Sequence, residues 1–69
     1  MKTSRGELSS SQIDAGLAVM RGEFKGAMVM SALSAAGVTD FVSAAERLIS
    51  RELKSGNIER ITRGIYRAS

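Results

Sequence analysis

The stretch from Thr39 to Arg67 constrains the fold most, because an amphipathic segment is followed by a glycine and then by a run rich in β-branched residues. Thr39 and Asp40 are good helix N-cap residues, since a short side-chain oxygen accepts hydrogen bonds from free backbone N–H groups. Gly56 and Asn57 tolerate the left-handed conformation that commonly follows a helix end. We therefore expect a helix over residues 40–55.

This helix has one apolar face and one polar face when its residues are projected at about 100° each. The apolar arc contains Phe41, Val42, Ala45, Leu48, Ile49 and Leu53, and the opposite side contains Ser43, Arg47, Ser50 and Lys54. We expect the first face to pack on a core and the second to meet solvent or a ligand. Glu52 departs from this pattern, because it projects about 20° from the centre of the apolar arc. It is expected either to reach solvent at the helix end or to pair with an Arg of the next element.

Residues 57–68 predict a β-hairpin with Gly64 in the positive-φ position of its loop. A loop of Thr62, Arg63 and Gly64 would pair Ile61 with Ile65, Arg60 with Tyr66, and Glu59 with Arg67. An isolated two-stranded hairpin is only marginally stable in water. We therefore expect Ile58 and Tyr66, on one face of the hairpin, to pack against the helices.

The N-terminal half predicts two shorter helices, so that residues 11–69 form one domain. Residues 1–10 show no periodic pattern and are expected to be a flexible lead. Ser10 or Ser11 can cap a helix over about residues 11–21, which ends at Gly22. A short extended connector follows, with Phe24 as its anchor in the core.

The second helix, over about residues 27–36, is apolar on most of its surface and is closed by Gly37. Such a helix is packed on several sides. Met28 and Met30 flank its tightest apolar stripe, either as core filler or as the surface of a homodimer, because methionine adapts to both. A chain of 69 residues without Cys has a marginal core, so a dimer or a bound partner would add stability.

Composition excludes several classes of function. The chain has neither Cys nor His, which removes thiolate and imidazole chemistry and the usual zinc sites. Glu46, Glu52 and Glu59 form no pair at catalytic spacing, so we expect no enzyme, no catalytic or metal site, no cofactor and no small-molecule substrate. No apolar run approaches the roughly 20 residues of a membrane span, and no secretory segment is visible. We therefore expect a cytoplasmic protein that does not enter a membrane.

The positive charge lies in the C-terminal half. Residues 1–40 contain four basic and four acidic side chains, whereas residues 41–69 contain six basic and three acidic ones, which accounts for the net charge of +3. Five of those six basic residues are Arg, whose planar guanidinium binds phosphates and guanine edges in a bidentate manner. An ordinary solvated face is the alternative explanation.

The predicted order is helix, short extended piece, helix, tight turn, helix and hairpin, which indicates an α+β winged helix-turn-helix. The segments GEFKGAMVMSALSAAG and LISRELKSGNIERITRGIYR resemble the winged-helix domain that opens AbiEi-type antitoxins and related bacterial and phage regulators. The matching positions of the hairpin are Gly56, Ile58, Glu59, Arg60, Ile61, Arg63, Gly64, Ile65 and Tyr66. Glu52 departs from the family, which usually has an aliphatic residue there. These antitoxins also carry a second domain that these 69 residues lack, so the resemblance implies a DNA-binding head rather than antitoxin activity.

The expected function is therefore sequence-specific binding of double-stranded DNA by a small bacterial or phage transcriptional regulator. Ser43, Arg47 and Ser50 would meet base edges in the major groove. Arg51, Lys54 and Thr39, with the first backbone N–H groups of the third helix, would bind phosphates. Arg60, Arg63 and Arg67 would contact the backbone or the minor groove. The alternatives are a winged-helix module that binds another protein and a phage architectural factor of the excisionase type.

Overall fold

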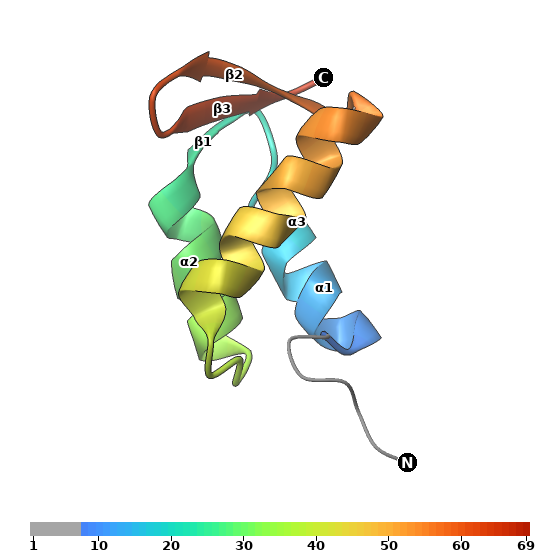
Figure 1. The fold of residues 1–69 in the computed structure, drawn as a ribbon, viewed down its shortest axis with the longest axis vertical. Coiled ribbons are helices and arrows are strands. Elements are labelled where there is room, and N and C mark those ends of the chain that lie inside the picture. Colours follow the sequence, from blue (N-terminus) through green and yellow to red (C-terminus); the bar gives the residue numbers. More distant parts are fainter. Residues whose placement is uncertain (1–7) are drawn as a thin grey trace.

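The computed structural model describes residues 8–69, which form three helices and a three-stranded antiparallel sheet (Figure 1). The elements are α1 (Ser10–Ala18), β1 (Glu23–Lys25), α2 (Gly26–Ala35), α3 (Phe41–Ser55), β2 (Ile58–Thr62) and β3 (Ile65–Ala68). The predicted α+β architecture with a C-terminal hairpin is confirmed. Most of the predicted lead, residues 1–7, lies outside the described residues. No helix within residues 8–69 is long and apolar enough to cross a membrane.

Helix α1 begins and ends earlier than predicted. Its cap is Ser9, not Ser10 or Ser11: the Ser9 hydroxyl accepts from the Gln12 backbone N–H at 3.3 Å, and the Gln12 side chain accepts from the Ser9 N–H at 3.0 Å. This reciprocal pair satisfies two N–H groups at the helix start. The helix ends at Ala18 because the chain tightens there, with the Met20 N–H donating to the Leu17 carbonyl and the Met20 side chain entering the core.

Helix α3 agrees with its predicted bounds to one residue and ends at Ser55, followed by Gly56, whose φ is 81°. Asp40 occupies the N-cap position, but its side chain caps none of the helix's N–H groups. The buried residues are Ala44, Ala45, Leu48 and Ile49. The prediction that Val42 belongs to the buried face is wrong: Val42 is 45% exposed. The buried arc includes Ala44, which places Val42 about 90° from its centre in the first turn.

The end of α3 is tied to the start of β2 through Glu52. Its carboxylate accepts a hydrogen bond from Asn57 Nδ2 at 2.8 Å, and the Asn57 backbone N–H donates to the Glu52 carbonyl at 3.0 Å. Glu52 is half-buried and its partner in this bond is Asn57 rather than an Arg of the hairpin. A carboxylate is therefore tolerated near the apolar arc because Asn57 satisfies it as the helix ends.

The hairpin formed by β2 and β3 has the predicted pairs Arg60–Tyr66 and Glu59–Arg67. The predicted pair Ile61–Ile65 is wrong, because Thr62 lies opposite Ile65 and an irregularity between Arg60 and Thr62 leaves Ile61 as an extra residue. Such a bulge leaves one residue unpaired and shifts the register by one residue beyond it. Ile61 is consequently 43% exposed.

The predicted extended connector before α2 is a strand that belongs to the sheet. β1 pairs with β3, so that the strand order is β1-β3-β2 and β3 is central. Phe24 lies opposite Tyr66, and their rings stack with centroids 5.7 Å apart. Phe24 is 2% exposed and Ile58 is 4% exposed, so the inner face of the sheet closes one end of the helical core.

The loop of the hairpin is attached to the start of α2. The Gly26 backbone N–H donates to the Gly64 carbonyl at 3.1 Å, just beyond the last β1–β3 pair. In Figure 1 the sheet lies across one end of the three helices, with its loop above the start of α2. The hairpin is thereby held in a defined position beside α3.

Candidate nucleic-acid interface

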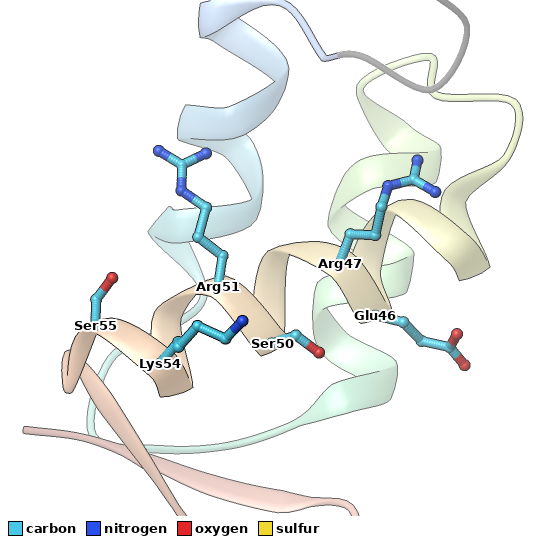
Figure 2. Close-up of a pocket in the computed structure, with 6 residues that line it drawn as sticks. All are labelled: Glu46, Arg47, Ser50, Arg51, Lys54 and Ser55. Atoms are coloured by element: carbon cyan, nitrogen blue, oxygen red, sulfur yellow. The ribbon is translucent and has the colours of Figure 1, made fainter.

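The exposed face of α3 brings four predicted site residues together. Arg47, Ser50, Arg51 and Lys54 are all exposed and line one open hollow together with Glu46 and Ser55 (Figure 2). They share this face because residues three and four apart along a helix are neighbours on its surface. The predicted polar face of α3 is therefore a continuous surface that carries three positive charges and one negative charge.

The charges on this face are arranged by sign. Figure 2 shows Arg47 and Arg51 extending from one flank of α3, whereas Glu46 points off the opposite flank. Lys54 and Ser50 lie between these two flanks. The face thus offers cations along one edge and, along the other, a carboxylate that can only accept hydrogen bonds when it is ionised.

A second groove, of about 560 Å³, lies between α3 and the hairpin. Tyr66, Ile49, Leu53 and Met30 give it apolar walls, and Lys25 and Arg60 add positive charge. Arg60 reaches this groove because it shares the inner face of the sheet with its cross-strand partner Tyr66.

Glu46 and Ser50 line both hollows, so the α3 face and the hairpin groove form one surface. Within residues 8–69, five basic side chains and one acidic side chain line it, which gives these residues a charge of +4; the basic residues are Lys25, Arg47, Arg51, Lys54 and Arg60. Such an excess of positive charge on one side of a small domain attracts polyanions.

The remaining predicted residues line neither of the two hollows. Thr39 is exposed in the turn before α3, and Ser43 is half-buried in the first turn of the helix. Arg63 is exposed in the hairpin loop beside Gly64, whose φ is 79°. Because Gly64 lines the hairpin groove, Arg63 extends the basic surface to the hairpin loop.

Arg67 is already paired. Its guanidinium donates to the Glu59 carboxylate through Nε at 3.1 Å and also through Nη2. Glu23 lies opposite Arg67 on the other neighbouring strand. The hydrogen bond and the charge of Glu59 raise the pKa of Arg67 above its ordinary value. Arg67 lies on the outer face of the sheet, away from Arg60, because side chains alternate along a strand.

The two methionines of the predicted dimer surface lie in separate places. Met28 is 45% exposed and lines a shallow hollow with Val19, Ala27, Ser31 and Ala32. Met30 is half-buried and lines the hairpin groove. They do not form one surface, because residues two apart on a helix point in different directions.

Two charged residues of the basic surface were not predicted from the sequence. Glu46 lies four residues before Ser50, and residues four apart are neighbours on the surface of a helix. The same helical spacing that placed Ser50 on the exposed face of α3 could therefore have predicted Glu46 beside it. Lys25 had no local signal, because its place depends on the pairing of β1 with a strand 40 residues later in the chain.

No protein-family model, curated protein or solved structure matches the chain. The resemblance of the hairpin segment to AbiEi-type antitoxins therefore stays a prediction.

Proposed function

We propose that this protein binds double-stranded DNA in a sequence-specific manner as a small transcriptional regulator of the winged helix-turn-helix type, acting in the cytoplasm of a bacterium or on behalf of a phage. Helix α3 enters the major groove, and the hairpin acts as the wing on the backbone or the minor groove. The observation that carries the proposal is the continuous basic surface of α3 and the hairpin groove.

The dimensions of α3 suit this role. Its 15 residues give a length of about 22 Å at 1.5 Å per residue. The major groove of B-DNA, about 12 Å wide, admits one α-helix. Only one face of α3 is buried in the domain, so the exposed face is available to base edges.

The position of each residue on α3 or the hairpin indicates whether it contacts base edges or phosphates. Arg47 and Ser50 lie on the exposed face of α3, where they meet base edges. Arg51 and Lys54, in its second half, together with Arg60 and Arg63 on the hairpin, contact phosphates. Phosphate contacts supply most of the affinity and base contacts supply the specificity. Arg67 contributes least, because Glu59 already occupies its guanidinium.

Fluorescence anisotropy with a labelled duplex at two salt concentrations tests the proposal. We expect affinity that falls with salt, and weaker binding by Arg51→Gln and by Arg63→Gln. Arg21→Gln is the matched control: it removes the same charge from an exposed residue that precedes β1, at the end of the sheet far from Gly64. The proposal fails if the wild type does not bind at low salt, or if all three variants lose affinity equally.

Two other outcomes identify the alternatives. A chain that binds no duplex but retains its fold would favour the protein-interaction alternative, for which the exposed Met28, Val42 and Ile61 are apolar contacts. Strong bending of the duplex on binding, measured by energy transfer between its ends, would indicate an architectural factor of the excisionase type.

A further inference from the structure

Among residues 8–69, Glu46 is the one acidic residue that lines the surface assigned to DNA. It is exposed, and it lines both the hollow on α3 and the groove beside the hairpin. Its carboxylate forms no salt bridge or hydrogen bond within residues 8–69, although five basic side chains line the same surface. The position of Glu46 is therefore not explained by a structural partner in the described chain.

A carboxylate at this place weakens any contact with phosphates. Like charges in proximity repel, and a desolvated carboxylate without a hydrogen-bond donor costs free energy. A surface that binds DNA only through its backbone would thus bind better without Glu46. The residue helps only if the bound DNA offers it a hydrogen-bond donor.

The major groove offers few such donors. Guanine presents N7 and O6, which are both acceptors, and thymine presents O4 and a methyl group. Adenine has the N6 amino donor, but the acceptor N7 lies beside it. Cytosine has the N4 amino donor without an adjacent acceptor on the same base. An ionised carboxylate, which only accepts, therefore fits cytosine best.

We propose, on the basis of the function proposed above, that Glu46 is a specificity-determining residue that accepts a hydrogen bond from the N4 amino group of a cytosine in the target site. The same charge disfavours guanine and thymine at that position and lowers the affinity for DNA that lacks the cytosine. Glu46 thus reduces non-specific binding by a surface with an excess of positive charge.

Selection of bound duplexes from a randomised library tests this role. The wild type is expected to enrich one position for cytosine by about tenfold, which corresponds to about 1.4 kcal/mol. Glu46→Ala loses that preference. Glu46→Gln shifts it toward adenine, because an amide matches the N6 and N7 pair of that base.

Asp14→Asn provides the matched control, because it makes the same change of charge at an exposed position on α1. This variant and the two Glu46 variants all become more positive, but only the Glu46 variants are expected to change the selected bases. If both Glu46 variants select the same site as the wild type, the role of Glu46 is refuted while DNA binding stands. If the wild type retains no duplex even at low salt, the proposed function and the inference fail together.

Discussion

Replacing Gly16 by Val tests how closely α1 packs on the helices that position the basic surface. A Cβ at residue 16 would lie 2.7 Å from Leu48 Cδ2 and 3.2 Å from Leu33 Cδ2. Favourable contacts between carbon atoms are about 3.5–4.0 Å long, so the Leu48 methyl group would have to move by about 1 Å. Leu48 is 4% exposed and Leu33 is 0% exposed, which leaves neither side chain free space nearby.

The cost follows from two opposing effects. Extra carbon atoms in a packed core cost about 1–3 kcal/mol, and the branched side chain of Val places this substitution near 3 kcal/mol. Val has a better helix propensity than Gly by about 0.4 kcal/mol, which offsets a small part. The net loss in the free energy of unfolding is about 2.5 kcal/mol. For a domain of this size, that loss lowers Tm by about 10–20 °C.

Thermal unfolding followed by far-ultraviolet circular dichroism measures the effect. Ala18→Val is the control, because Ala18 is exposed on the same helix. It should cost only the difference in helix propensity, about 0.6 kcal/mol. The reasoning is refuted if Gly16→Val unfolds at the same temperature as Ala18→Val, since α1 would then not lie in close contact with Leu48.

Three further predictions concern the cap, the hairpin loop and the basic surface. Ser9→Ala removes the acceptor for the Gln12 N–H and should cost about 1 kcal/mol in thermal unfolding; an unchanged Tm would contradict the capping box. Gly64→Ala should cost about 1 kcal/mol in urea unfolding because its φ is 79°, with nothing within 4 Å of the added Cβ. Gly64→Asn should cost less, since Asn tolerates this conformation better, and equal losses would point to another cause. If Arg51, Lys54, Arg60 and Arg63 each neutralise one phosphate, affinity should fall about 150-fold between 50 and 200 mM salt, with a log–log slope of about −3.6. Arg51→Gln should reduce the size of that slope by about 0.9, and an unchanged slope would exclude Arg51 from the interface.

The C-terminal elements could be predicted well because their signals are local. Gly56 ends α3 in the expected left-handed conformation, and Gly64 adopts positive φ in the hairpin loop. Each glycine marks a backbone conformation that other residues adopt at a cost. The helical spacing of Leu48 and Ile49 likewise identified the centre of the buried face.

The sequence was less informative where two local solutions compete. Ser9, Ser10 and Ser11 are all acceptable caps, and the choice depends on Gln12, which sits three residues after Ser9 and completes a capping box. The bulge at Ile61 is a second case in which two local solutions compete. The apolar pattern of the hairpin is compatible with a register that includes Ile61 in a pair and with one that leaves it unpaired, and the position of the loop determines which register forms.

Tertiary pairing could not be predicted from local pattern at all. β1 is only three residues long, which is too short for a period-two signal, and its partner β3 lies 40 residues further along the chain. This pairing nevertheless stacks Phe24 on Tyr66 and attaches the hairpin loop to α2. The groove between α3 and the hairpin, with Lys25 in its lining, is a consequence of that pairing.

Arg63 and Arg67 show how the same residue type acquires different roles within four positions of the chain. Both are exposed arginines of the hairpin, and composition alone treats them as equal cations. Arg67 belongs to the central strand, where Glu59 lies opposite on one side and Glu23 on the other, and Glu59 binds its guanidinium. Arg63 lies in the loop, where neither neighbouring strand places a carboxylate opposite it. The strand order, rather than the number of arginines, therefore determines which positive charges are available to a phosphate.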